Sequence, residues 1–152
     1  MTAAGDAAPQ FRCIAIVGLG LMGGSLAMAL RRLPRPPRIV AAGADAADLE
    51  RGLAQGIVDD AAADAGGAVA EADLVVFATP VSATLELLAS TRSRIRDDAV
   101  VTDVGSVKRS VVGRARAVGL GARFIGGHPI AGSHRSGLAA ARADLYDGAR
   151  VW

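Results

Sequence analysis

Continuous apolar runs recur along the chain and alternate with longer segments whose apolar residues are spaced as on one helical face. Unbroken apolar runs are typical of parallel strands that are covered on both faces. The predicted strands are 11–17, 38–43, 73–78, 98–103 and 123–125, and 149–152 resembles the start of another. The predicted helices are 21–32, 46–55, 68–72, 82–95, 107–118 and 137–146. This alternation predicts an α/β fold with a doubly wound, mostly parallel sheet and helices on both faces.

The first predicted strand leads directly into a glycine-rich turn with the spacing Gly-x-Gly-x-x-Gly. In such a turn Gly18 permits a sharp bend, Gly20 leaves the backbone open to a pyrophosphate, and Gly23 lets the helix pack closely on the strand. The N–H groups at the start of the helix and its dipole favour phosphate. The pattern predicts a Rossmann-type dinucleotide site formed by Gly18, Leu19, Gly20, Leu21, Met22 and Gly23.

An acidic residue follows the second predicted strand, where dinucleotide-binding folds hold the adenosine ribose. Asp45 lies 22 residues after Gly23, and a carboxylate there accepts hydrogen bonds from the ribose hydroxyls. It also repels a 2′-phosphate, so NAD is favoured over NADP. The alternative is that Asp45 only caps the next helix. Three nearby arginines would weaken the preference: Arg35, Arg38 and Arg51.

The same region admits a second interpretation as a membrane segment. Cys13–Leu30 is a run of 18 uncharged residues that is followed by Arg31 and Arg32, which resembles a membrane span or signal anchor. Glycines interrupt this run, and a coherent α/β pattern follows it. The soluble interpretation is therefore favoured.

Composition and length fit one soluble domain. The chain has 152 residues, 51% of them hydrophobic, which is enough for one buried core. Residues 11–152 are predicted to form the nucleotide-binding domain, and 1–10 a flexible N-terminal extension. The net charge of +2 gives no reason to expect a nucleic-acid or membrane partner. Cys13 is the only cysteine and cannot form an internal disulfide, which favours a reducing, cytoplasmic location.

The residues best suited to chemistry follow the predicted strands. In doubly wound sheets, ligands bind at the carboxyl ends of the strands. Besides the glycine turn and Asp45, these positions hold Thr79-Pro80, the segment 103–106 and His128. We therefore expect one site along this edge of the sheet.

Each polar candidate has a catalytic and a purely structural interpretation. His128 is the natural proton acceptor near neutral pH, and the alternative is a histidine that only stabilises its loop. Ser106 orients a substrate hydroxyl or the nicotinamide amide, caps the following helix, or does both. Lys108 either meets a substrate carboxylate or remains solvated, and His134 is expected to be exposed. No metal site is predicted, because a solvated acidic face explains Asp59, Asp60 and Asp64.

Four segments together resemble the prephenate dehydrogenase family, which includes arogenate and cyclohexadienyl dehydrogenases. The resemblance extends from residue 11 to residue 152. Its most specific parts are the Ser-Val-Lys and His-Pro-Ile-Ala-Gly-Ser blocks, whereas the glycine turn alone is common to many dehydrogenases. The segments that carry it are 18–25, 78–80, 102–108 and 127–133.

The resemblance implies NAD-dependent oxidative decarboxylation of prephenate or arogenate on the route to tyrosine. It implies that His128 accepts a hydrogen bond or proton from the substrate hydroxyl, that Ser106 orients hydroxyl and cofactor, and that Ser133 lies on the substrate side. It adds Thr79 and Pro80 to the cofactor site. Family members often carry glutamate at the position of His134, so the resemblance does not carry an acidic role over to this residue.

Members of this family continue into a helical domain that forms a homodimer and supplies substrate-binding groups. The chain lacks a counterpart of that domain, so we expect it to be the cofactor-binding half. Three alternatives remain open at this stage. In the first, the substrate is arogenate rather than prephenate. In the second, the enzyme is another NAD(P)-dependent dehydrogenase, such as a 3-hydroxyacid dehydrogenase or an imine reductase. In the third, the isolated chain is a non-catalytic NAD-binding module.

Overall fold

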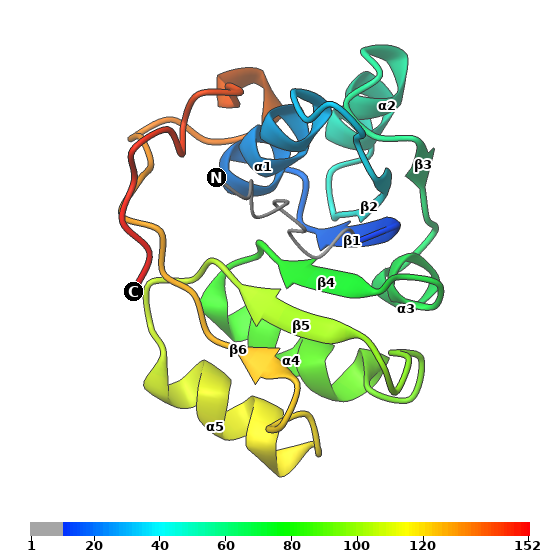
Figure 1. Cartoon of the computed structure of the whole chain (residues 1–152), viewed down its shortest axis with the longest axis vertical. Helices are drawn as coiled ribbons and strands as arrows, with labels where there is room; N and C mark the ends of the chain where they lie inside the picture. Colours follow the sequence, from blue (N-terminus) through cyan, green and yellow to red (C-terminus); the bar gives the residue numbers. More distant parts are fainter. Residues whose placement is uncertain (1–10) are drawn as a thin grey trace, which may run out of the picture.

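A parallel sheet forms the centre of the molecule, in a computed structural model that describes residues 11–152 (Figure 1). The expected N-terminal extension, 1–10, lies outside the described residues. The sheet has six strands in the order β3-β2-β1-β4-β5-β6, which is the doubly wound order of dinucleotide-binding folds. The strands are β1 (Cys13–Val17), β2 (Arg38–Ala42), β3 (Asp60–Ala61), β4 (Leu74–Phe77), β5 (Val100–Asp103) and β6 (Phe124–Ile125).

Helices cover both faces of the sheet. They are α1 (Leu21–Arg31), α2 (Ala46–Ala54), α3 (Ala65–Val69), α4 (Val81–Thr91), α5 (Arg109–Ala117) and the short 3-10 helix η1 (Leu138–Ala140). Alternate residues of β1 belong to different cores. Ala15 and Val17 pack with α3, α4 and α5, whereas Ile14 and Ile16 pack with α1, α2 and η1. Burial on both faces explains the unbroken apolar runs of the sequence.

The uncharged run Cys13–Leu30 divides into β1, the glycine turn and most of α1. It is therefore not one continuous helix. Within residues 11–152, no helix combines the length and hydropathy that crossing a membrane requires.

The helix predicted for 137–146 is wrong. The only helix described there is the single 3-10 turn η1, and side chains from elsewhere in the fold bind two amides of this segment. The Asp48 carboxylate accepts from the Leu138 N–H at 3.0 Å, and the Ser25 hydroxyl accepts from the Arg142 N–H at 3.0 Å. Gly137, directly before this turn, has a φ of +79°, a left-handed conformation that a helix does not continue through.

Several predicted boundaries also differ from the structure. Helix α4 ends at Thr91, short of the expected end at residue 95, because the chain turns tightly there. Helix α3 starts earlier than predicted, because the Asp64 carboxylate accepts from the Gly67 N–H at 2.7 Å and caps it. The unassigned stretch after α2 contains β3. At the C-terminal end the expected strand is a single antiparallel bridge between Pro129 and Val151.

The acidic residues after α2 all have structural partners. Asp59 accepts from the Ile39 N–H at 2.7 Å and pairs with Arg31 at 2.8 Å. Its neighbour Asp60 pairs with Arg38 at 2.7 Å. These contacts attach the start of β3 to β2 and to the end of α1.

We predict that Asp59→Asn destabilises the protein at neutral pH but not in acid. Burial alone raises the pKa of Asp59, but the Ile39 amide and Arg31 outweigh it and hold that pKa below its usual value. A lowered pKa in the folded state stabilises the protein above the unfolded-state pKa, and this stabilisation disappears as the pH falls through the folded-state pKa. Because the side chain is 43% exposed, solvent limits the loss to about 1 kcal/mol at pH ~7.

Urea unfolding at pH ~7 and at pH ~3 measures this difference. Asp97→Asn is the control, because that side chain is 97% exposed and makes only long contacts with arginines. An equal loss of stability for Asp59→Asn at both pH values would contradict the assignment.

Candidate functional site

The carboxyl ends of the strands meet along one edge of the sheet. In Figure 1 the arrowheads of β4 and β5 point toward the side where the C-terminal segment of the chain runs. A cleft of about 210 Å³ lies where β1, β2 and β4 end. It is lined by Gly18, Leu19, Gly20, Gly43, Ala44, Asp45, Asp48, Ala78, Thr79 and Pro80. A larger hollow of about 410 Å³ lies between α4 and α5, away from these strand ends.

The glycine turn has the geometry that a dinucleotide needs. Gly18 has a φ of +102°, and a Cβ on it would lie 2.5 Å from the Ala78 carbonyl oxygen. A Cβ on Gly23 would lie 1.9 Å from the Gly18 carbonyl oxygen, so α1 packs directly against the turn. A Cβ on Gly20, by contrast, would meet no described atom within 4 Å. The turn is therefore closed on the protein side and open on the cleft side.

The N-terminus of α1 carries backbone donors without a side-chain cap. Gly20 is the N-cap residue, no side chain bonds the first amides, and the first turn has no acidic residue. Such unpaired N–H groups at the positive end of the helix dipole bind phosphate. The residues of the turn thus fit the pyrophosphate of a dinucleotide.

Asp45 caps the helix that follows β2 and also lines the cleft. Its Oδ1 accepts from the Ala47 N–H at 2.9 Å and the Asp48 N–H at 3.2 Å, so it caps α2. It also lines the cleft, together with Gly43, the residue directly after β2. Sequence reasoning missed Asp48, whose role depends on the contact with Leu138, 90 positions away.

The remaining predicted cofactor residues divide into two groups. Thr79 and Pro80 line the cleft, and the Thr79 hydroxyl is fixed by that of Thr84 at 2.8 Å. Leu21, Met22 and Gly23 belong to α1 and are not part of the cleft wall.

Met22 has a structural contact with the C-terminal segment. Its carbonyl oxygen accepts from the Tyr146 hydroxyl at 2.7 Å. Burial raises the pKa of Tyr146 to about 12, so the phenol stays protonated as a donor. This bond holds the end of the chain against the start of α1.

A buried carboxylate organises the other part of the edge, where β5 and β6 end. Asp103 is the last residue of β5, and its side chain is only 1% exposed. It pairs with Lys108, whose Nζ also donates to the Gly127 carbonyl oxygen at 2.7 Å. Lys108 is therefore not a freely solvated side chain. Ser106 lies between these two residues in the sequence and is exposed. No described side chain caps α5, so the alternative that Ser106 caps this helix is wrong.

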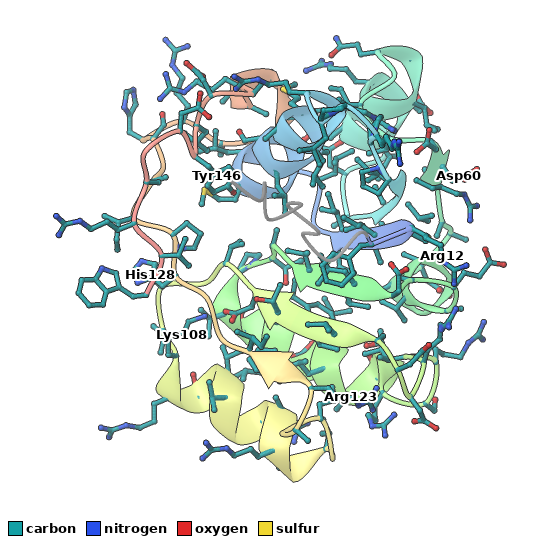
Figure 2. The ribbon with its side chains drawn as sticks, viewed as in Figure 1. Arg12, Asp60, Lys108, Arg123, His128 and Tyr146 are labelled. Atoms are coloured by element: carbon teal, nitrogen blue, oxygen red, sulfur yellow. The ribbon has the colours of Figure 1, made fainter. Side chains whose placement is uncertain are left out.

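The imidazole of His128 is half-buried at the same edge, and its backbone is fixed by the C-terminal residue. The His128 N–H donates to the Trp152 carbonyl oxygen at 2.7 Å, and its own carbonyl accepts from the Trp152 N–H at 3.1 Å. Figure 2 shows His128 and Lys108 close to the same side of the sheet. Ser133 is exposed and accepts from the Arg135 N–H at 3.0 Å, and His134 is exposed as expected.

This combination of strand order, closed glycine turn and uncapped helix defines a Rossmann-type nucleotide-binding domain. Comparison with known proteins identifies the family. Residues 26–152 match the sequence model described as prephenate dehydrogenase, nucleotide-binding domain. The chain therefore belongs to the prephenate dehydrogenase family, as the sequence motifs indicated, and this decides against the other dehydrogenase classes considered.

Individual relatives support the same assignment. The prephenate dehydrogenase of Bacillus subtilis is 43% identical over 141 residues, covering 90% of this chain and 37% of that protein. The structure of A. aeolicus prephenate dehydrogenase in complex with hydroxyphenyl propionate and NAD+ has a TM-score of 0.85 at 33% identity, covering 93% and 50% of the two chains. Synechocystis arogenate dehydrogenase has a TM-score of 0.83 at 33% identity, covering 91% and 48%. The chain thus spans half or less of the length of these relatives.

We predict that Gly20→Val leaves the domain folded but weakens NAD binding at least about tenfold. A Cβ at this position meets no described atom within 4 Å, and we expect the valine to occupy the space that the pyrophosphate needs. Calorimetric titration with NAD measures the affinity, and circular dichroism verifies the fold. Gly113→Val on α5 is the matched control, because a Cβ there also meets nothing within 4 Å but lies away from the cleft. Unchanged NAD affinity in folded Gly20→Val would refute this placement of the pyrophosphate.

Proposed function

We propose that this chain is the cofactor-binding half of an enzyme that uses NAD to decarboxylate prephenate oxidatively, forming 4-hydroxyphenylpyruvate for tyrosine biosynthesis. The observation that carries the proposal is the position of His128, whose backbone is fixed at the edge of the sheet that also holds the glycine cleft. The Bacillus subtilis relative, a prephenate dehydrogenase, supports the substrate. The A. aeolicus relative was solved with NAD+ and hydroxyphenyl propionate, which supports the cofactor and an aromatic ligand.

The order of the strands suggests how the dinucleotide lies across the edge. The adenosine ribose faces Asp45 beyond β2, the pyrophosphate lies at the glycine turn after β1, and the nicotinamide reaches past Thr79 toward His128. This path follows the sheet from its β2 side to its β6 side. The pyrophosphate, where the negative charge of the dinucleotide is concentrated, then lies at the uncapped amides of α1.

The residues near β5 and β6 then have distinct roles in the reaction. Bound NAD supplies the acceptor for the hydride that leaves the ring carbon bearing the hydroxyl group. The His128 imidazole takes the proton of that hydroxyl as its C–O bond becomes a carbonyl. Ser106 orients the hydroxyl and Ser133 contacts the substrate. The ring carboxylate then leaves as CO2, and the electrons of its broken C–C bond move through the ring onto the carbonyl oxygen. His128 returns the proton to that oxygen, which gives the phenol, and the aromaticity gained drives the reaction.

Arogenate is a second candidate substrate. The Synechocystis arogenate dehydrogenase and the A. aeolicus prephenate dehydrogenase are equally similar to this chain in sequence, at 33% identity each. Arogenate would give tyrosine directly by the same bond changes. For the whole protein we propose a cytoplasmic homodimer that acts on a small molecule.

The experiment that tests the function is NADH formation with prephenate and arogenate side by side. It uses the complete gene product, with the 152-residue chain assayed beside it. The substrate with the higher kcat/KM is the one we assign. NAD binding without turnover of either substrate by the complete product would contradict the enzymatic proposal and favour a non-catalytic NAD-binding module.

In the same assay we predict that His128→Asn lowers kcat by about 10²–10⁴-fold, because general-base catalysis is lost. The NAD dissociation constant stays unchanged, because His128 is not part of the cleft wall. Turnover at the wild-type rate would refute the base role.

Cofactor preference gives a separate prediction, because Asp45 and Asp48 both line the cleft. A 2′-phosphate would meet two negative charges there, so we propose that NAD is preferred over NADP. We predict that Asp45→Asn lowers the NAD-over-NADP affinity ratio about tenfold, while the amide still caps α2.

Titration with both dinucleotides measures this ratio. Asp64→Asn is the matched control, since Asp64 caps α3 in the same way but is not part of the cleft wall. An unchanged ratio in Asp45→Asn would show that Asp45 does not select the cofactor.

A further inference from the structure

The Asp103 carboxylate is the one described acidic group whose residue is almost fully buried, at 2% exposure. An ionised carboxylate is tolerated inside a protein only when it is paired and hydrogen-bonded. Lys108 supplies the pair. The backbone supplies the rest, because Oδ2 accepts from the Gly105 N–H at 3.0 Å and Oδ1 accepts from the Gly127 N–H at 3.3 Å.

The two glycines held by this carboxylate occupy equivalent places in two different loops. Gly105 directly precedes Ser106 in the loop after β5. Gly127 directly precedes His128 in the loop after β6. One buried carboxylate therefore fixes the backbone immediately before each of the two residues that we assign to catalysis.

Lys108 completes the connection between these loops. Its Nζ bonds both Asp103 and the Gly127 carbonyl oxygen, so both backbone polar groups of Gly127 are held. The backbone itself is also close, since a Cβ on Gly127 would lie 2.9 Å from the Asp103 carbonyl oxygen. The loop before His128 thus packs against the end of β5 without space for a side chain.

We propose that Asp103 is a positioning residue that sets the distance and orientation between Ser106 and His128, with Lys108 as its counter-ion. This inference rests on the proposed function. Asp103 is too deeply buried to touch a substrate and acts through the loops that it holds. The same contacts assign Lys108 to Asp103 and Gly127, in place of the substrate carboxylate that the sequence also allowed.

The first test is Asp103→Asn in the complete gene product. Asparagine has the same shape but only one acceptor oxygen, so it cannot accept from Gly105, Gly127 and Lys108 together. We expect kcat to fall about 100-fold, the effect of moving a catalytic group by about 1 Å. The NAD dissociation constant should change less than about twofold, because the cleft at β1, β2 and β4 does not include Asp103.

Two controls separate positioning from a general loss of stability. Asp59→Asn also removes a carboxylate that binds a backbone amide. Asp59 lies beside β2 and β3, at the other end of the strand order from β5 and β6, so kcat per folded molecule should be unchanged. The amide NMR signals of Gly105 and Gly127 should both move in Asp103→Asn and neither should move in Asp59→Asn. Unchanged kcat in folded Asp103→Asn, or unmoved signals for both glycines, would overturn the proposal.

A second pair of variants decides the question if Asp103→Asn does not fold. Lys108→Met removes both contacts of Nζ, and Lys108→Arg keeps the charge and donors. We expect kcat to fall about tenfold in the first, with partial recovery in the second and little change in substrate KM. A large rise in KM with unchanged kcat would instead place Lys108 on the substrate and overturn the proposal. If the wild-type protein is inactive on both substrates, the proposed function is overturned. If the wild-type protein is active and the variants have the same kcat, only the positioning role of Asp103 is overturned.

Discussion

The close contact between the start of α1 and the turn that precedes it determines how the rest of the molecule is arranged. Because a Cβ on Gly23 would lie 1.9 Å from the Gly18 carbonyl oxygen, only glycine lets the helix pack this near. Gly18 is in turn pressed against Ala78 at the end of β4. These contacts align β1, β4 and the N-terminus of α1 at one edge, so the cleft follows directly from backbone packing.

Five of the six described strands could be predicted from the sequence because burial on both faces leaves unbroken apolar runs, as in β1 and β4. The exception is β3, which has only two residues, both exposed. The segment 137–146 could not be predicted either. Its alanines and leucines suit a helix locally, but Asp48 and Ser25 satisfy its amides from other elements. Tertiary hydrogen bonds outweighed helix propensity there, and no local pattern signals a bond that spans such a separation.

The position of the candidate site was predictable for a similar reason, since strand ends in a parallel sheet meet at one edge. What the sequence did not show is how the loops are held together. The spacing of Asp103 and Lys108 on one strand-to-helix segment permits an ion pair, but the pairing of both with Gly127 depends on β5 lying beside β6. Helix α5 starts only at Arg109, and Ser106 lies before it as an exposed loop residue.

The edge of the sheet therefore consists of two parts that are stabilised by different kinds of interaction. Around β1 and β4, close backbone contacts between small residues shape the cleft, and no buried charge is involved. Around β5 and β6, a buried ion pair fixes two loops through directional hydrogen bonds. Backbone packing tolerates no added side chain but is insensitive to charge, whereas the ion pair depends on both partners being ionised. The cleft and the loops before Ser106 and His128 are consequently open to separate change by substitution, even though both lie along a single edge of one small sheet.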